Sequence, residues 1–255
     1  MPCLSMEGVM LHGSRALRLL LVTLIAGCQP AAEPTGTGGQ SLTPTTPTAV
    51  SAAANGDQPA PATTPFVSEA GFQLITFDQM AVFPTDGSAA QTWTAEGDEF
   101  LCTGKPKCYL HTKTPYGDGT LRFDYKFEPD PKITDPAKLA GHNTGVLLFI
   151  QEPHAVWPKS IEVQGKHSEM GQLRPNGGAV AVEFQDSPEV RESARNPVGE
   201  WNSVEIVTKA GAITASINGQ IVAVGQPGEL TSGLIGLQAE GHRLRYRHLR
   251  FAPAQ

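Results

Sequence analysis

The stretch Leu121-Arg-Phe-Asp-Tyr-Lys-Phe127 alternates apolar side chains with charged ones at every step. Successive side chains of a β-strand point to opposite faces, so this period of two predicts a strand with one buried face and one wet face. Such strands are typical of antiparallel sheets, in which one face packs on a core and the other meets solvent. The stretch therefore predicts an antiparallel sheet.

Further stretches on both sides of it predict more strands. Val146-Leu-Leu-Phe-Ile150 is a continuous apolar run, which is typical of a central strand covered on both faces. Asn218-Gly219, between two apolar stretches, is the strongest short hairpin signal in the chain. The other predicted strands are 179–184, 201–207, 213–217, 221–224, 234–239 and 244–251. With 27 Gly, 21 Pro and no long helical period, the sequence predicts an all-β fold, an antiparallel β-sandwich of the jelly-roll type.

The N-terminal residues 1–28 are typical of an export signal. Arg15 and Arg18 precede an apolar run, 19–25, that is too short to span a bilayer as a helix. The run leads into Ile25-Ala-Gly-Cys28, which resembles the lipobox of bacterial lipoproteins, where the cysteine thiol is lipidated; an ordinary signal peptide with an incidental cysteine is the alternative. We expect a membrane anchor at Cys28 and a place in the cell envelope, on the periplasmic face or at the outer membrane surface.

Residues 29–65 are rich in Thr, Pro and Ala and contain almost no large apolar side chain. Such a segment cannot bury enough surface to offset its ordering entropy, so we expect a disordered tether. The folded jelly-roll domain is then predicted over 66–255. Within it, an oxidising compartment would permit a disulfide between Cys102 and Cys108, and two unpaired buried thiols are the alternative.

The charge balance excludes one class of partner. The formal net charge is −6, whereas a nucleic-acid-binding domain needs a basic surface to meet phosphates. No phosphate-binding glycine loop followed by a helix is present either. We expect no nucleic-acid partner.

Two predicted strands each place a Glu and a Gln on one face. In Ser160-Ile-Glu-Val-Gln164 the alternation puts Glu162 and Gln164 together, and in 235–240 it puts Gln238 beside Glu240. Carboxylates and amides offer the paired donors and acceptors that suit sugar hydroxyls, and a Glu there could act as acid or base. If both strands lie in one sheet, these side chains line a polar groove; otherwise they are solvent-facing residues of exposed strands.

Other candidate residues lie close to these strands in sequence. His167 follows the Glu162 strand at its end, and Asn143 precedes the central strand. Trp157 could be a platform on which a sugar ring stacks, although an aromatic side chain is more often part of a core. The stretch Glu162-x-Gln164-x-x-His167 departs from the Glu-x-Asp-x-x-Glu motif of laminarinase-type sandwiches, which argues against retaining glycosidase chemistry with two carboxylates on one strand.

Over about residues 70–252 the sequence resembles the 3-keto-disaccharide hydrolase family, long described as a domain of unknown function. The opening departs from the family's usual Phe-Asp-Gly-Lys segment, because Phe77-Asp78-Gln-Met stands there. The matching pieces keep their order and spacing: Gly71-Phe72, Tyr116-Gly-Asp-Gly-Thr-Leu-Arg-Phe123, His142-Asn-Thr-Gly-Val146, Trp157-Pro-Lys-Ser-Ile-Glu-Val-Gln164, Gly199-Glu-Trp-Asn202, Ile217-Asn-Gly219 and Gly233-Leu-Ile-Gly-Leu-Gln-Ala-Glu240.

The resemblance implies a concanavalin A-like jelly roll that cleaves 3-keto-glycosides or 3-keto-disaccharides, by hydrolysis or by elimination followed by hydration. It implies that Glu162 and His167 supply base, acid or metal-ligand roles, with a divalent metal ion as a possible cofactor. Asn143, Gln164, Gln238, Glu240 and Trp157 would bind the sugar. The competing hypothesis is a non-catalytic carbohydrate-binding module of an envelope lipoprotein, because this fold serves lectins as readily as enzymes.

Overall fold

The computed structural model describes residues 66–255 of the chain. The predicted signal peptide, Cys28 and the predicted tether lie outside the described residues, so these interpretations stay predictions. Within 66–255, no helix is long and apolar enough to cross a membrane.

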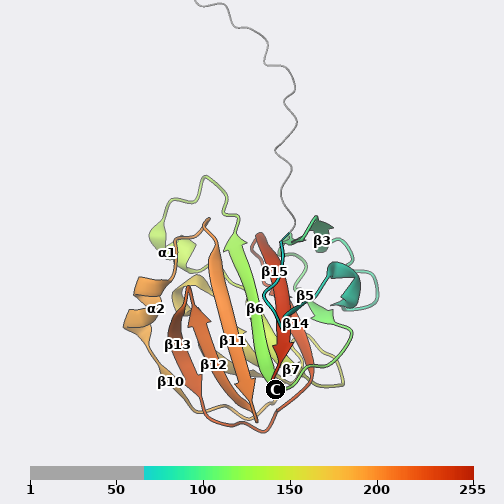
Figure 1. The fold of residues 1–255 in the computed structure, drawn as a ribbon. Coiled ribbons are helices and arrows are strands. Elements are labelled where there is room, and N and C mark those ends of the chain that lie inside the picture. The colour runs from blue at the N-terminus through green and yellow to red at the C-terminus, as the bar shows by residue number, and fades with distance from the viewer. Residues whose placement is uncertain (1–65) are drawn as a thin grey trace, which may run out of the picture. The chain divides into compact units, whose positions relative to one another are not determined.

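Two antiparallel sheets pack face to face and form a sandwich (Figure 1). Sheet A, as described, has nine strands, in the spatial order β10 (Phe184–Asp186), β13 (Gln220–Gly225), β12 (Ala212–Ile217), β11 (Asn202–Lys209), β6 (Gly119–Phe127), β15 (Leu244–Pro253), β4 (Glu99–Cys102) and β3 (Trp93–Glu96), with β1 (Gln73–Leu74) paired to β15. Sheet B has the order β2 (Met80–Phe83), β5 (Cys108–Thr112), β14 (Leu234–Ala239), β7 (Gly145–Ile150), β8 (Ser160–Gln164) and β9 (Leu173–Asn176). The predicted all-β antiparallel sandwich, a concanavalin A-like jelly roll, is confirmed.

Helical structure in the described part is short. α1 (Pro136–Ala140) begins at Asp135, whose carboxylate accepts a hydrogen bond from the Ala137 amide, and α2 (Pro188–Ala194) also starts with a proline at its first position. Two 3₁₀ turns, η1 (Phe77–Gln79) and η2 (His167–Glu169), complete the elements.

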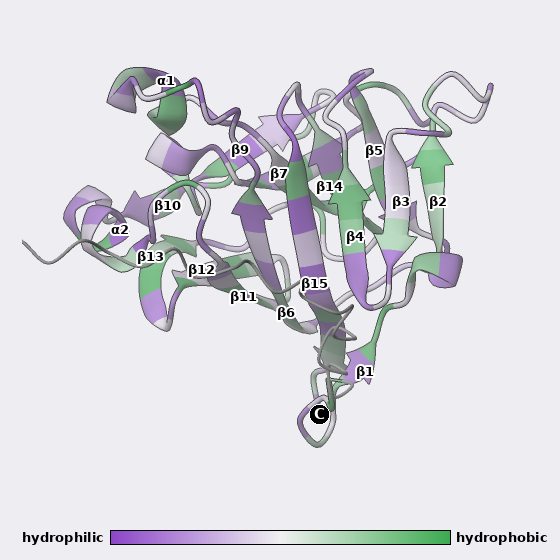
Figure 2. Cartoon of the chain, turned by 90° about the horizontal axis from the view of Figure 1, so that it is seen from above, coloured by the Kyte–Doolittle hydropathy of each residue, from purple (hydrophilic) through white to green (hydrophobic). Residues whose placement is uncertain are grey.

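The alternation that predicted β6 is visible in its burial. Leu121, Phe123 and Tyr125 point into the space between the sheets and are almost fully buried, whereas Arg122 and Asp124 lie on the outer face of sheet A. Figure 2 shows the same banding of hydrophilic and hydrophobic residues along β15. The main core therefore lies between the two sheets, and both sheets contribute side chains to it.

Sheet B is buried on both faces over much of its area. β7 has all of its residues buried, as the continuous apolar run predicted, because a second apolar cluster covers the face of sheet B that points away from the core. That cluster consists of Tyr109, Leu147 and Ile150, with Phe83, Trp157 and Leu234 packed against it. We call this face the outer face of sheet B.

One predicted strand is wrong. Residues 179–184 were expected to form a strand, but only Phe184 belongs to one, at the start of β10. Val180 is 61% exposed, and its amide donates to the Glu229 carboxylate at 3.0 Å instead of pairing with a neighbouring strand. The apolar alternation there belongs to a surface loop in which Val182 is buried in the core and Ala179 packs against it.

The possible disulfide is also absent from the structure. Cys102 ends β4 of sheet A, Cys108 begins β5 of sheet B, and both are free buried thiols. Burial raises the pKa of Cys102 to about 12, against a weaker opposing hydrogen bond from the Gly104 amide, and burial also raises the pKa of Cys108. The two side chains are part of the apolar core.

Candidate functional site

The outer face of sheet B brings together the Glu and Gln residues of both predicted strands. Glu162 on β8 is the Cα partner of Leu147 on β7, and Gln164 is the partner of Gly145. On the other side of β7, Leu237 of β14 pairs with Val146, so Gln238 lies beside Gly145. The two strands share sheet B, one of the two alternatives that the sequence left open, and β7 alone separates them.

Glu162 and Gln238 meet above Gly145. A β-carbon placed on Gly145 would lie 2.3 Å from Gln238 Oε1 and 2.4 Å from Glu162 Oε1. The two side chains thus fill the space that any other residue at position 145 would occupy. Glu162 is 6% exposed and Gln238 is 1% exposed, so the pair is shielded from water.

The other carboxyl oxygen of Glu162 has a partner. Asn176, at the end of β9, donates from Nδ2 to Glu162 Oε2 at 2.9 Å. Burial raises the pKa of the Glu162 carboxyl, the hydrogen bond from Asn176 opposes that shift, and the negative charge of Glu240 adds to it. A raised pKa brings a carboxyl closer to the neutral range in which it can exchange protons with a substrate.

Glu240 lies at the solvent edge of the same face. Its carboxylate accepts a hydrogen bond from Asn143 Nδ2 and is 3.6 Å from the Lys107 ammonium. The Lys107 side chain is 65% exposed and that of Glu240 is 11% exposed, so solvent reaches the site from this side. The site therefore combines one buried carboxyl group, that of Glu162, with one ion-paired carboxylate, that of Glu240.

Gln164 and Trp157 lie near this pair but serve local packing. Gln164 Oε1 accepts a hydrogen bond from the Lys166 amide at 2.8 Å and so holds the turn that follows β8. Trp157 packs against Tyr109, with ring centroids 6.4 Å apart, as part of the apolar cluster on the outer face. The structure thus places both on the predicted face, with Trp157 inside an apolar cluster.

His167 begins η2, directly after the turn that ends β8. Its Nε2 donates to the Asn196 carbonyl at 3.0 Å, and its amide donates to the His142 carbonyl. Burial lowers the pKa of its imidazole, and the groups that act on it electrostatically are Arg195, Glu192 and His142. The hydrogen bonds and charged neighbours found for His167 in the described structure do not include Glu162, and its catalytic role stays a prediction.

The strand β8 ends at Gln164. Alternation of faces holds only within a strand, and Gly165 and Lys166 turn the chain into η2, which carries His167 to the side of α1 and Asn196. The alternation along β8 therefore does not predict on which face His167 lies.

Sequence reasoning missed a second polar group on this face. Tyr109 is the Cα partner of Gln238, and its hydroxyl is 2.7 Å from His154 Nδ1. Burial raises the pKa of the Tyr109 phenol, so the hydroxyl keeps its proton and donates a hydrogen bond to the imidazole. His154 Nε2 is in turn 3.0 Å from the exposed Glu152 carboxylate. This chain of contacts joins a loop residue to a strand residue 45 positions away, which no local pattern reveals.

The predicted divalent ion finds no built site. The described residues contain no group of three or more His, Cys, Asp or Glu side chains that could hold a metal ion. The residues on the outer face of sheet B supply two carboxyl groups and amides, which fall short of such a set. The metal stays a prediction, and no chemical step below depends on it.

Two open hollows lie away from this face. One of about 250 Å³ is lined by Arg122, Glu205 and Arg250 on the outer face of sheet A, and one of about 390 Å³ lies beside Phe66, Phe77 and His248. Neither contains Glu162, Gln238 or Glu240. The candidate site is defined by convergent polar groups and not by an open hollow.

The fold and the carboxyl-bearing sheet face define a protein of the concanavalin A-like jelly-roll class. Residues 80–252 match the family described as the 3-keto-alpha-glucoside-1,2-lyase-like domain, which covers more than half of the chain. The chain belongs to this family, and the resemblance read from the sequence is confirmed. A comparison with curated proteins finds no significant match.

Solved structures share the fold at low sequence identity. A candidate glycosyl hydrolase from Parabacteroides distasonis ATCC 8503 aligns with a TM-score of 0.52 and 18% identity, over 75% of this chain and 99% of its own. A second candidate glycosyl hydrolase from the same organism aligns with a TM-score of 0.51 and 18% identity, over 72% of this chain and 99% of its own. These similarities show the fold alone.

Proposed function

We propose that this domain cleaves glycosides in which C3 of a sugar ring has been oxidised to a ketone. The observation that supports this most strongly is the convergence of Glu162 and Gln238 over Gly145, beside the Glu240 carboxylate, in a chain of this family. The reaction must remove one proton and deliver another. Two carboxyl groups in different surroundings, one buried and one ion-paired, suit these two roles.

The chemistry follows from the ketone. A C3 carbonyl acidifies the hydrogen on C2, so a base can remove that proton and leave the electron pair as an enolate between C2 and C3. When the carbonyl re-forms, the electrons make a C1–C2 double bond, the C1–O bond breaks, and the departing oxygen takes a proton. Water then adds across the double bond, which completes a net hydrolysis.

In this proposal Glu240 is the base. Its carboxyl group contacts Lys107 and Asn143, and its place at the solvent edge lets a substrate approach. Lys107 is the nearest positive charge to Glu240, so it is the group that would face the enolate oxygen. The amides of Asn176 and Gln238 would contact sugar hydroxyls.

The test uses 4-nitrophenyl 3-keto-glucoside in D₂O. We expect release of nitrophenol, incorporation of deuterium at C2 of the sugar product, and no turnover of the unoxidised glucoside. Glu240→Gln should lower kcat by about 100-fold or more, because a general base contributes roughly 10²–10⁴-fold. The matched control is Glu205→Gln, which changes a carboxylate on sheet A and should leave kcat unchanged.

Binding of the 3-keto-glucoside without turnover would contradict the proposal. It would support the second candidate, a non-catalytic carbohydrate-binding module, since the same face could hold a sugar without cleaving it. Turnover that Glu240→Gln leaves unchanged would remove this residue from the reaction.

A further inference from the structure

Two buried acceptor oxygens face one another at the centre of the site. Glu162 Oε1 and Gln238 Oε1 both lie against the same point above Gly145. Within the described part of the chain, neither oxygen has a hydrogen-bond partner, although both are shielded from water. A buried acceptor without a donor has lost its hydrogen bonds to water without replacement, and two acceptors that face each other also repel.

A proton between the two oxygens removes this conflict. If Glu162 is a neutral carboxylic acid, its Oε1 becomes a hydroxyl that donates to Gln238 Oε1. The other oxygen, Oε2, is then the carbonyl oxygen, and it already accepts from Asn176 Nδ2 at 2.9 Å. Every oxygen of the pair has a partner in that arrangement.

The charges around Glu162 favour the neutral form. Arg174 on β9 is its Cα partner and lowers the pKa of the Glu162 carboxyl, but Arg174 is exposed and forms an ion pair with Glu169, and its effect is smaller than that of Glu240. On the opposite side the Glu240 carboxylate acts on Glu162 with a like charge. Burial raises the pKa of the Glu162 carboxyl further than the neighbouring donors lower it.

We infer that Glu162 is a neutral carboxylic acid that shares its proton with Gln238 and delivers this proton to the departing oxygen of the substrate. The catalytic part rests on the proposed function. In the step, the Glu162 Oε1–H bond breaks, an O–H bond forms on the leaving group, and C1–O breaks with its electron pair on that oxygen. Glu162 is left as a carboxylate. When water adds, its oxygen bonds to C1, one of its protons returns to Glu162, and the proton that Glu240 removed returns to C2.

The protonation state is tested by stability, without any substrate. Glu162→Gln replaces the hydroxyl by an amide that can donate to Gln238 in the same way. The pKa of Glu162 is higher in the folded chain than in the unfolded chain. The neutral acid therefore stabilises the fold fully below the unfolded pKa of 4.5, and this stabilisation is lost as the pH rises toward the folded pKa. The unfolding constant of the wild type, divided by that of the variant, should rise by up to tenfold per pH unit in that window.

The control for this measurement is Glu183→Gln, which changes an exposed carboxyl of the surface loop. Its ratio to the wild type should show no such rise. A ratio for Glu162→Gln that stays flat above pH 4.5 would overturn the inference, because it would mean that Glu162 is ionised and that the Gln238 amide donates to it. If Glu162→Gln does not fold, the ¹³Cδ carboxyl signal of Glu162 in the wild type gives the titration directly.

A metal ion is the other species that could lie between the two oxygens. After dialysis against a chelator, addition of Mg²⁺, Ca²⁺ or Mn²⁺ should leave the melting temperature of the wild type unchanged. A rise in the wild type that Glu162→Gln abolishes would assign the position to a cation and overturn the shared proton.

The acid role is tested by the leaving group. Methanol is a poor leaving group that needs a proton, whereas 4-nitrophenolate departs without one. Glu162→Gln should therefore slow methyl 3-keto-glucoside by roughly 10²–10⁴-fold and the nitrophenyl substrate far less. Equal slowing of both would contradict the acid role alone, whereas no turnover of either substrate by the wild type would contradict the proposed function and leave the stability test standing.

Discussion

Gly145 shows how much of the candidate site depends on the absence of one side chain. It lies on β7 between the strands that carry Glu162 and Gln238, and the two side chains reach across it until they meet. A central strand normally favours β-branched or aromatic residues, so a glycine there lacks a packing reason of its own. Its reason is the close approach of two polar groups from neighbouring strands.

Gly145→Ala should therefore disrupt the site at its centre. The new methyl group would lie within 2.4 Å of both carboxyl and amide oxygens, and overpacking of this kind costs about 1–3 kcal/mol. Urea denaturation should show that loss, and turnover of the 3-keto-glucoside should fall with it. Gly117→Ala is the matched control, because its β-carbon would meet nothing closer than 3.6 Å. Equal stability of the two variants would show that the Glu162 and Gln238 side chains can move apart to admit the methyl group without loss of stability.

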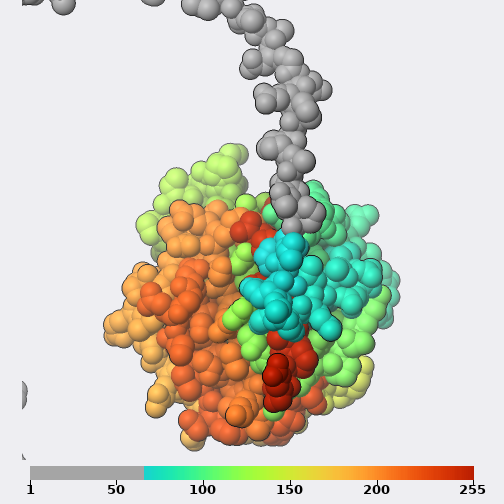
Figure 3. Space-filling view, in the orientation of Figure 1, coloured from blue at the N-terminus to red at the C-terminus, as the bar shows by residue number. Residues whose placement is uncertain are grey.

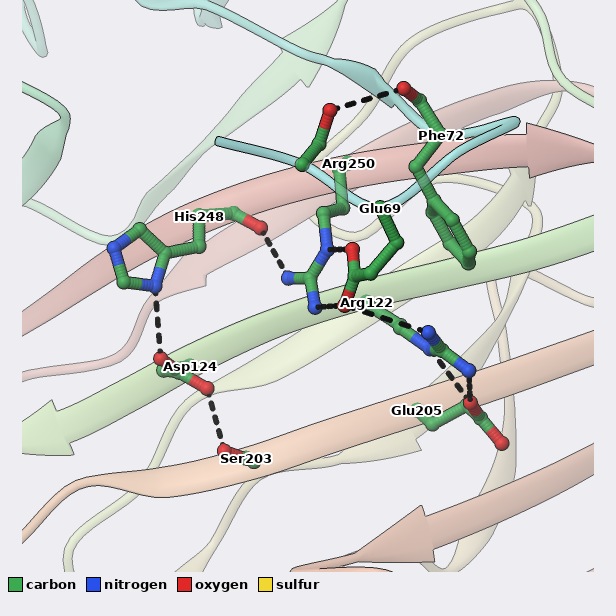
Figure 4. A network of polar contacts seen from close by, with 9 residues as sticks. Glu69, Phe72, Arg122, Asp124, Ser203, Glu205, His248 and Arg250 are labelled. Atoms are coloured by element: carbon green, nitrogen blue, oxygen red, sulfur yellow. Dashed lines mark hydrogen bonds and ion pairs between the residues drawn. The ribbon is translucent and has the colours of Figure 1, made fainter. Parts of the chain in front are cut away.

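At the scale of elements, the described chain begins with a segment, 66–72, that lies on the outer face of sheet A (Figure 3). Figure 4 shows how it is held: Glu69 bonds to Arg250 of β15 and approaches Arg122 of β6, while the Phe72 ring lies under the Arg122 guanidinium at 4.6 Å. Phe66 stacks on His248 with centroids 3.8 Å apart. The arginines of β15 are thus paired with acidic groups on a solvated strand face.

The contact of this segment with sheet A should weaken in acid. The hydrogen bond from Arg250 is the main cause that lowers the pKa of Glu69 to about 2. Because the pKa of Glu69 is lower in the folded chain than in the unfolded chain, its carboxylate stabilises the fold above the unfolded pKa of 4.5. This stabilisation is lost as the pH falls toward 2. Because the Glu69 side chain is 47% exposed, solvent screening keeps the effect below about 1 kcal/mol.

Glu69→Gln measures the stabilisation that the Glu69 carboxylate provides. Its stability deficit against the wild type, from urea denaturation, should be constant above about pH 5 and vanish near pH 2. Glu183→Gln, a change in an exposed carboxyl, provides the baseline. A deficit that persists at pH 2 would mean that the Glu69 side chain stabilises the segment by packing and not by charge.

At the scale of the whole molecule, the two sheets are held together by an uninterrupted core. Tyr125 and Tyr246 of sheet A are buried in it, and each hydroxyl has a partner that belongs to sheet B or adjoins it: Tyr125 donates to the Gly165 carbonyl at 3.0 Å, and Tyr246 is 2.8 Å from Thr144 Oγ1. Cys102 and Cys108 enter the same core from opposite sheets. Burial of apolar surface and these few hydrogen bonds hold the two sheets together, without a disulfide between Cys102 and Cys108.

The free thiols can be checked directly. In the folded full-length chain, iodoacetamide at pH 8 should leave Cys102 and Cys108 unmodified, because both are buried and burial raises the pKa of each thiol. In denaturant without a reducing agent, peptide mass spectrometry should find both alkylated. Peptides that stay unmodified in denaturant until a reductant is added would establish the disulfide that the structure lacks.

The sequence predicted the regular strands well and the irregular regions poorly. The predicted strand 234–239 has the bounds of β14, and Leu121-to-Phe127 lies within β6, because alternation reports burial directly. The strand expected at 179–184 was wrong, since the Val180 amide found the Glu229 side chain instead of a neighbouring strand. The short strands β1 to β4 carry too few residues for a period of two to stand out.

What the sequence determined by itself was the all-β architecture and that Glu162 and Gln238 lie on the faces of their strands opposite to the core, because side-chain direction along a strand follows from backbone geometry alone. What only the tertiary structure decided was which side chains meet. The order of strands in sheet B placed Gly145 between Glu162 and Gln238, and the turn after β8 brought His167 to the Asn196 carbonyl. Strand order and turns depend on packing between distant parts of the chain, and local alternation holds no information about either.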